Sequence, residues 1–361
     1  SGGAQRVVLF DEGDPLALAC GRTLAPVEVA YCTYGTLNAA GDNAVFVCHA
    51  LTGDAEASGP DGWWSAMIGP GRPIDTERFF VICPNLLGGC RGTTGPSSTD
   101  PRTGHAYGLD FPPLAIADLV TVHRRLLSHL GIARLHTAIG GSMGGMQIVQ
   151  WLIDAAGEIA NAVLVGASPR LSAQNIALSA VARRAILDDP DFRGGDYARH
   201  GVRPDRGLAT ARRLAHVTYL SEEGMARKFT RAEPAGWASV DDGARWLDPA
   251  YDVETYLEHQ AAIFLARFDA LSYLYLTRIM DAFDPFGAPV TLDPAARALV
   301  VAFDSDWRFG PEHSVALAAG LRAGGLGVVD ERLVASPWGH DSFLLDVPEY
   351  LDAVREFVAA A

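Results

Sequence analysis

The feature that most constrains this chain is the glycine-rich stretch from Leu135 to Trp151, LHTAIGGSMGGMQIVQW. It begins as an apolar run, passes through a serine with a glycine two residues before it and two residues after it, and ends in helix-forming residues. This pattern is typical of a nucleophile elbow, in which a strand turns sharply into a helix and presents the serine hydroxyl at the edge of a sheet. We expect a strained backbone at Ser142, and we expect glycine at 140 and 144 because side chains there would collide with the neighbouring strand and helix.

The motif alone also fits an ordinary glycine-rich turn, so its meaning depends on the residues farther along the chain. In an elbow-type enzyme, an acid and then a histidine come after the serine. Asp304 and Asp306 follow an apolar run at 299–303, and His340 lies in the later stretch SPWGHD. We favour Asp306 over Asp304, because DWRFGP places Asp306 at the turn that leaves the strand. His49 is the weaker candidate for the base, because it precedes the serine and ends a strand.

Apolar periodicity predicts the order of the elements. Buried strands are expected at 43–49, 78–84, 135–139, 161–167, 299–303 and 330–335, a strand on the antiparallel side at 26–37, and helices at 115–130, 312–323 and from 348. From 168 to about 286 the strand-like runs disappear, and helical stretches occur at 175–187, 208–220, 253–267 and 272–283. The order predicts an α/β-hydrolase fold: a mostly parallel sheet with helices on both faces and an inserted helical cap. Residues 1–168 and 287–361 would form the core domain, and residues 169–286 the cap.

The loop after the predicted strand at 43–49 reads Ala50-Leu51-Thr52-Gly53-Asp54. In this fold, that loop supplies one N–H of the oxyanion hole, and the residue after the nucleophile supplies the other. This assigns Leu51 and Met143, both through the backbone. A second loop, at 85–98, is long, polar and rich in glycine, which is typical of a functional loop.

Composition narrows the classes of partner. The 29 Lys and Arg against 43 Asp and Glu give a net charge of −14, which argues against nucleic acid or an anionic membrane as the main partner. No apolar run reaches the length of a membrane span, and the first residues lack a signal-peptide pattern, so we expect a cytoplasmic protein. The five cysteines have no Cys-x-x-Cys spacing, and no His-Glu-x-x-His occurs, so we expect reduced thiols and neither a bound metal nor another bound cofactor.

Over nearly its whole length the sequence resembles the homoserine O-acyltransferases of methionine biosynthesis, and among these the acetyl type most closely. The strings that carry the resemblance are CHALTGDA at 48–55, GWW at 62–64, IGPGRPIDT at 68–76, LLGGCRGTTGPSS at 86–98, GGSMGGMQ at 140–147, TYLSEEGM at 218–225, RFDALSYLYLTR at 267–278, SDWRFGP at 305–311 and GHDSF at 339–343. The resemblance implies Ser142, Asp306 and His340 as a catalytic triad, with Leu51 and Met143 as the oxyanion donors.

The resemblance also implies a substrate site, with Arg212 as partner of the homoserine carboxylate and with Tyr219 and Asp341 near the amino acid. A planar guanidinium suits a carboxylate because it can bind both oxygens, and Asp341 would hold the ammonium group beside His340. From the residues alone, Arg212 could equally be a solvated helix arginine like its neighbour Arg213. The family further implies a homodimer with L-homoserine and acetyl-CoA as substrates, whereas the sequence does not indicate which residues contact CoA.

The expected reaction is a ping-pong transfer, in which acyl-CoA acylates Ser142, CoA leaves, and His340 deprotonates the γ-hydroxyl of homoserine. Asp54 and Glu56 bring negative charge near the entrance, where an unpaired succinyl carboxylate would be unfavourable to bury, so we expect acetyl transfer. Arg91 could still turn inward and pair a succinyl carboxylate. Succinyl transfer is therefore the alternative, followed by a serine esterase of the same fold and by a ligand-binding protein without catalysis.

Overall fold

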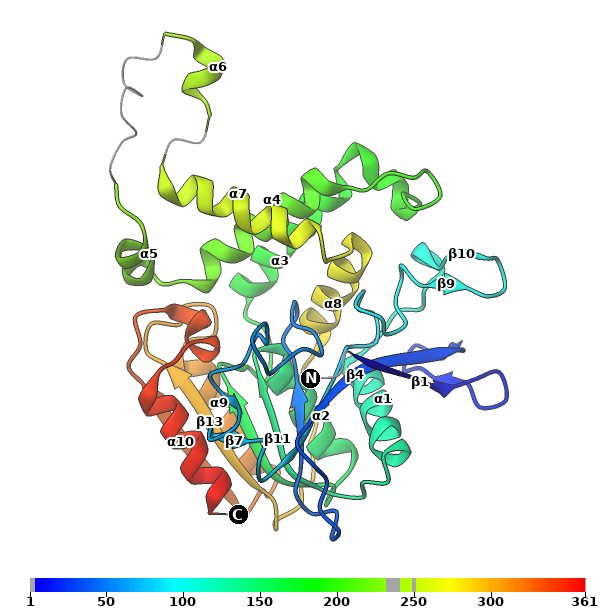
Figure 1. Ribbon diagram of the computed structural model, residues 1–361, viewed down its shortest axis with the longest axis vertical. Helices are drawn as coiled ribbons and strands as arrows, with labels where there is room; N and C mark the ends of the chain where they lie inside the picture. The colour runs from blue at the N-terminus through cyan, green and yellow to red at the C-terminus, as the bar shows by residue number, and fades with distance from the viewer. Residues whose placement is uncertain (1–3, 232–240, 249–250, 361) are drawn as a thin grey trace.

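The computed structural model describes residues 4–231, 241–248 and 251–360. At its centre lies an eight-stranded sheet with the order β1-β4-β8-β5-β11-β12-β13-β14 (Figure 1). These strands are β1 (Gln5–Phe10), β4 (Val27–Tyr34), β5 (Ala44–Cys48), β8 (Phe80–Pro84), β11 (Leu135–Gly141), β12 (Ile159–Val165), β13 (Arg297–Phe303) and β14 (Val328–Val334). Neighbours from β8 to β14 are parallel, whereas β4 pairs antiparallel with β1 and β8. The predicted mostly parallel sheet is confirmed, and β1 is a strand that the apolar pattern did not predict.

In the described parts of the chain, three pairs of short strands lie outside this sheet. They are β2 (Leu16–Ala17) with β3 (Thr23–Leu24), β6 (Ile68–Gly69) with β7 (Ile74–Asp75), and β9 (Thr99–Asp100) with β10 (His105–Ala106). All five cysteines of the chain are free thiols.

Helices cover both faces of the sheet, as predicted. In β5, Phe46 packs on one face in the cluster that includes α1 (Ile116–His129), α2 (Met143–Asp154) and α9 (Pro311–Ala323). Its neighbours Val45 and Val47 pack on the other face, in the cluster that includes α10 (Pro348–Ala359). Every residue of β5 is buried, because a central parallel strand with both faces covered meets no solvent.

Between β12 and β13 the chain leaves the sheet and forms a group of helices above it (Figure 1). These are α3 (Ala173–Leu187), α4 (Asp205–Tyr219), α5 (Glu222–Lys228), α6 (Gly243–Trp246), α7 (Asp252–Leu265) and α8 (Ala270–Ala282). The described residues of this segment contain no strand, and we call α3, α4, α7 and α8 the cap helices. None of the helices in the described ranges is long and apolar enough to span a bilayer.

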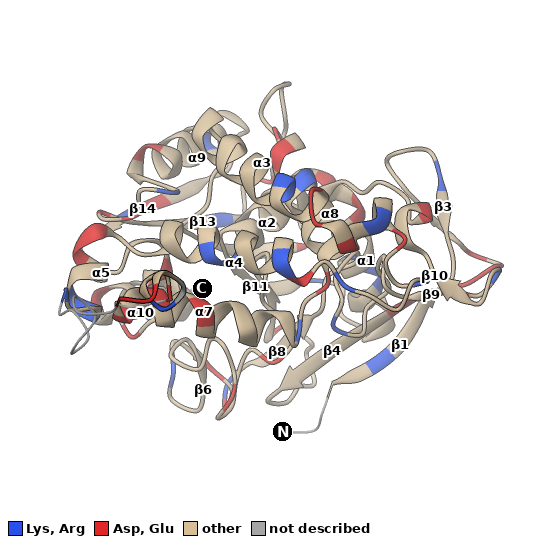
Figure 2. Ribbon diagram, turned by 90° about the horizontal axis from the view of Figure 1, so that it is seen from above, with Lys and Arg blue, Asp and Glu red and all other residues tan. Residues whose placement is uncertain are grey.

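The cap helices carry basic positions in a chain that is acidic overall. Figure 2 looks down on them and shows Lys and Arg in blue on α4, which contains Arg206, Arg212 and Arg213. Of these three, Arg212 is buried, and α4 packs mainly against α3 and α7. A local positive charge is therefore available on the side of the cap that faces the sheet.

Candidate active site

The turn from β11 into α2 has the geometry expected of a nucleophile elbow. Ser142 has φ 56° and ψ −122°, and its N–H donates to the carbonyl of Val165 at 2.9 Å. A Cβ on Gly144 would lie 2.0 Å from the carbonyl oxygen of Cys48, and one on Gly140 would lie 2.7 Å from the carbonyl carbon of Gly144. The expected strain at the serine and the need for glycine on both sides are thus confirmed.

His340 and Asp306 meet next to this turn. His340 lies in the 3-10 helix Gly339–Leu344 (η4), and its Nδ1 is 2.7 Å from Oδ2 of Asp306. The other oxygen of Asp306 accepts the backbone N–H groups of Arg308 and Phe309 at 3.0 and 2.9 Å. Burial by itself would raise the pKa of Asp306, but the adjacent His340 and these N–H donors lower it overall. The carboxylate can therefore hold Nδ1–H and leave Nε2 of His340 to exchange a proton with Ser142.

The competing acid has a different contact. Oδ1 of Asp304 accepts the backbone N–H of Ser336 at 2.9 Å and ties the end of β13 to the loop after β14. Asp304 is exposed, whereas Asp306 is only 2% exposed. The structure therefore brings Asp306, and not Asp304, to the histidine.

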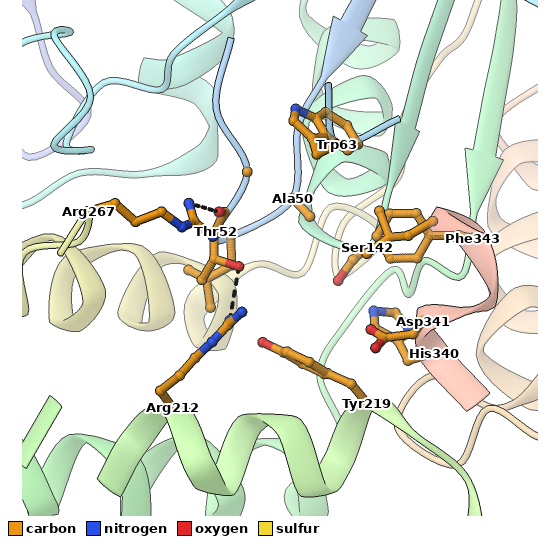
Figure 3. Close-up of a pocket in the computed structure, with 13 residues that line it drawn as sticks. Ala50, Thr52, Trp63, Ser142, Arg212, Tyr219, Arg267, His340, Asp341 and Phe343 are labelled. Carbon is orange, nitrogen blue, oxygen red and sulfur yellow. Dashed lines mark hydrogen bonds between the residues drawn. The ribbon is translucent and has the colours of Figure 1, made fainter. Parts of the chain in front are cut away.

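A cavity of about 150 Å³ opens above Ser142 and His340 (Figure 3). It is lined by Ala50, Leu51, Thr52, Gly53, Trp63, Ser142, Arg212, Tyr219, Arg267, His340, Asp341, Phe343 and Leu344. Six of the eight predicted site residues are in this lining. The other two do not line the cavity: Asp306 contacts His340, and Met143 follows Ser142 as the first residue of α2.

The two predicted oxyanion donors are Leu51, which lines the cavity with Ser142, and Met143, which directly follows the serine. Leu51 occupies a turn closed by a hydrogen bond from the N–H of Gly53 to the carbonyl of Ala50 at 3.0 Å. Met143 is the first residue of α2, where a backbone N–H has no partner within the helix and the helix dipole is positive. Both positions suit the stabilisation of negative charge on a substrate oxygen at Ser142.

Arg212 reaches the cavity from α4. Its Nη1 is 3.3 Å from Oγ1 of Thr52, and its guanidinium lies 4.6 Å from the ring centroid of Phe264. The Nε of Arg212 is buried without a hydrogen-bond partner, and among the described residues no carboxylate forms an ion pair with this side chain. A buried cation in this state can pair with the carboxylate of a ligand.

Asp341 and Tyr219 complete this side of the cavity. Burial raises the pKa of Asp341, although the nearby His340 and Arg212 partly offset that effect. The ring of Tyr219 lies 6.1 Å from that of His340, and Figure 3 shows it between Arg212 and the histidine. Arg212 and Asp341, a cation and a carboxylate, therefore lie on opposite sides of Tyr219 in the cavity (Figure 3).

Two hydrogen-bonding side chains of the lining, Arg267 and Trp63, were not singled out in the sequence. Arg267 donates from Nη1 to the carbonyl of Thr52 at 2.9 Å and lies 3.9 Å from Asp54, which also faces Arg91 at 3.5 Å. Trp63 donates from Nε1 to the carbonyl of Asp54 at 2.8 Å. Both residues lie in strings that carry the family resemblance, RFDALSYLYLTR and GWW, and those strings were the available signal. No group of three or more potential metal ligands occurs in the described parts of the chain.

Comparison with known proteins supports the fold and identifies the family. The sequence profile of the α/β hydrolase fold matches residues 43–347. A homoserine O-succinyltransferase of a Nocardioides species is 54% identical over 98% of this chain and 97% of its own length. A homoserine O-acetyltransferase of Nitrobacter hamburgensis is 45% identical over 99% of this chain and 91% of its own.

Solved structures of related proteins have the same fold. The homoserine O-acetyltransferase of Bacillus anthracis superposes with a TM-score of 0.85 at 25% identity, covering 99% of this chain and 98% of that one. Esterase E22 superposes with a TM-score of 0.84 at 26% identity, covering 98% of this chain and all of its own. With relatives this similar over nearly the full length, the chain belongs to the homoserine O-acyltransferases, a family with the α/β hydrolase fold.

Proposed function

We propose that this protein transfers an acyl group from acyl-CoA to the γ-hydroxyl of L-homoserine through an acyl-Ser142 intermediate. The observation that carries this proposal is the pair Arg212 and Asp341, which line one cavity with Ser142 and His340. Homoserine carries a carboxylate and an ammonium group, and this pair offers one charge to each. A cavity of about 150 Å³ suits a small amino acid and a short acyl group.

The steps follow from the positions of these groups. Oγ of Ser142 attacks the thioester carbon while Nε2 of His340 takes the hydroxyl proton, and the N–H groups of Leu51 and Met143 stabilise the oxyanion. The carbon–sulfur bond then breaks, and His340 returns the proton to the thiolate of CoA. Homoserine next gives its γ-hydroxyl proton to His340 and attacks the acyl-enzyme, which forms the product ester and restores the Ser142 hydroxyl.

The acyl group depends on the charge around the cavity. The sequence favours acetyl because Asp54 and Glu56 would repel a succinyl carboxylate. Asp54, however, lies between Arg91 and Arg267, and Glu56 is solvent-exposed, so that repulsion loses its basis. Arg91 does not line the cavity, but Arg267 does. The lining therefore contains a second cation besides Arg212, the arginine that homoserine would engage.

The relative at 54% identity is named a succinyltransferase, whereas acetyltransferases appear at 45% and 46%. We therefore propose succinyl-CoA as the donor, with acetyl-CoA as the competing candidate. The test compares kcat/KM for the two donors at saturating homoserine. A value for acetyl-CoA equal to or above that for succinyl-CoA would contradict this choice and leave the acyltransferase proposal intact.

A serine esterase remains the second candidate, because esterase E22 has the same fold at 26% identity. Release of CoA from acyl-CoA distinguishes the two functions. We expect steady-state release to require homoserine and to stop after one equivalent per active site in its absence. Continuous release without homoserine would favour hydrolysis, and release of no CoA would favour a binding protein.

By the same family resemblance, we propose that the protein acts as a homodimer in the cytoplasm, in methionine biosynthesis, without a bound cofactor. Sedimentation equilibrium should give twice the chain mass of 38.4 kDa. A single-chain mass at assay concentrations, with full activity, would contradict the dimer.

A further inference from the structure

A buried histidine that the acyl-transfer steps leave unused directly precedes residues 50–54, the oxyanion loop, which carries the N–H of Leu51. His49 follows β5, is 3% exposed, and has its Nδ1 2.7 Å from the carbonyl oxygen of Ala50. Because a carbonyl only accepts hydrogen bonds, Nδ1 carries the proton. Nε2 is then unprotonated, and it has no hydrogen-bond partner in the described structure. Burial lowers the pKa of His49, which is consistent with a neutral ring.

The hydrogen bond of His49 acts on one particular peptide group. The carbonyl of Ala50 and the N–H of Leu51 belong to the same peptide unit, and in a trans peptide these two groups point in opposite directions. The carbonyl is held by His49 and also by the N–H of Gly53 at 3.0 Å. Holding the carbonyl from this side points the N–H of Leu51 away from the histidine ring. A Cβ on Gly53 would lie 2.9 Å from the Cβ of His49, so the ring and the turn are packed together.

A second buried side chain connects this loop to the serine turn. Gln147 of α2 is fully buried, and its Nε2 donates to the carbonyl oxygens of His49 at 3.1 Å and of Met143 at 3.2 Å. Its Oε1 lies 2.9 Å from Nε2 of His123. Burial lowers the pKa of His123 to about 4, so its ring is neutral at pH 7 and donates from Nε2. These contacts define the orientation of the amide, because both carbonyls require a donor and only its NH₂ group can supply two.

We propose that His49 and Gln147 are positioning residues for the oxyanion hole. His49 orients the N–H of Leu51, and Gln147 holds the oxyanion loop against the first turn of α2, which carries the N–H of Met143. Neither side chain lines the cavity, so both act through the backbone. This inference rests on the proposed function, because it requires a tetrahedral intermediate at Ser142.

The test uses four variants of the full chain. His49→Leu removes the ring donor, His49→Asn keeps a donor near the position of Nδ1, and Gln147→Met removes the amide at similar volume. Thr137→Val is the matched control, because Thr137 is equally buried in β11 but contacts neither oxyanion segment. Near-UV circular dichroism and thermal unfolding establish that each variant is folded, and if His49→Leu does not fold, His49→Asn and Gln147→Met still test the inference.

The pre-steady-state burst of p-nitrophenol from p-nitrophenyl acetate measures acylation of Ser142 separately from homoserine binding. Loss of a whole oxyanion donor lowers the rate by about 100- to 1,000-fold, so a misdirected donor should lower the maximal acylation rate constant by about 10- to 100-fold in His49→Leu and Gln147→Met. We expect the ester concentration that gives half of this rate to change less than about twofold, and we expect His49→Asn and Thr137→Val to stay within about fivefold of the wild type.

Inhibition separates orientation of the donors from general stability. The compound 1,1,1-trifluoro-2-butanone forms an anionic tetrahedral adduct with serine, so its affinity should fall in step with the acylation rate constant, whereas the Kd of CoA should not change. An unchanged acylation rate constant in His49→Leu and Gln147→Met, no recovery in His49→Asn, or equal weakening of both ligands would overturn the inference. A wild type that is acylated by the ester but does not transfer the acyl group to homoserine would overturn the proposed function and leave this test valid.

Discussion

Replacing Asp306 by asparagine changes one atom at the centre of the site. The two N–H donors from Arg308 and Phe309 bind Oδ1, which asparagine retains. The atom that faces His340 at 2.7 Å, however, changes from an acceptor to an NH₂ group. Two donors would then point at each other, so the ring would move its proton to Nε2 or turn away. In either case, His340 could no longer accept the proton of Ser142.

The size of this effect follows from the role of the ring. A histidine held in the wrong tautomer, without the charge that stabilises its protonated form, lowers kcat by about 10⁴-fold in enzymes with this triad. We therefore expect kcat of Asp306→Asn to fall by about 10³- to 10⁴-fold, with KM for acyl-CoA within about threefold. The assay follows CoA thiol release with a chromogenic disulfide at saturating homoserine.

Asp304→Asn is the matched control, because asparagine can keep the single hydrogen bond from Ser336. Its kcat should stay within about fivefold of the wild type. Equal losses in both variants, or a larger loss in Asp304→Asn, would refute the assignment of the acid.

The pH dependence of stability gives a second measurement on Asp306. Its pKa is lowered in the folded state, so its ionised form stabilises the protein above the unfolded value of 3.8, and this contribution disappears as the pH falls below it. Asp306→Asn should therefore lose less stability than the wild type on acidification through this range. An identical loss in both proteins would contradict the lowered pKa.

Three further predictions concern the nucleophile and the amino-acid site. Ser142→Ala should abolish acyl transfer with thermal unfolding unchanged within about 3 °C, since little volume is lost; more than about 1% residual transfer would exclude the acyl-serine route. Arg212→Lys should lower kcat/KM for homoserine by about 10- to 100-fold, because an ammonium group cannot bind both carboxylate oxygens. The single-turnover burst of CoA release should persist, and loss of this burst would assign Arg212 to the donor site. The pKa of Asp341 is raised, so the folded state disfavours the charged carboxylate. Asp341→Asn should therefore raise Tm at pH 7 and weaken homoserine binding. A lowered Tm would contradict the direction of the pKa shift.

Local patterns in the sequence were sufficient to predict the nucleophile elbow and the order of the helices and strands. The glycines at 140 and 144 indicate that other backbone segments pass close to the turn, because a Cβ at either position would clash with backbone atoms in the structure. Buried strands such as β5 are unbroken apolar runs, because neither face meets water. Short elements without such a run, such as α5 and α6, were not predicted. The strand β1 at the sheet edge was also not predicted, because several of its residues are exposed.

Contacts between distant segments were decided only by the tertiary structure. The ion pairs of Asp54 join three loops, and they place two arginines beside a carboxylate for which the sequence indicated no partner. The network of His49, Gln147 and His123 joins a strand end to two helices. It makes His49, which the sequence offered only as a weaker candidate for the base, a proposed positioning residue. The hydroxyl, ring and carboxylate of the triad candidates also come from separate segments. Local composition determines whether a residue favours a strand, a turn or a helix, whereas the partner of a polar side chain depends on which segments the fold brings within hydrogen-bond distance.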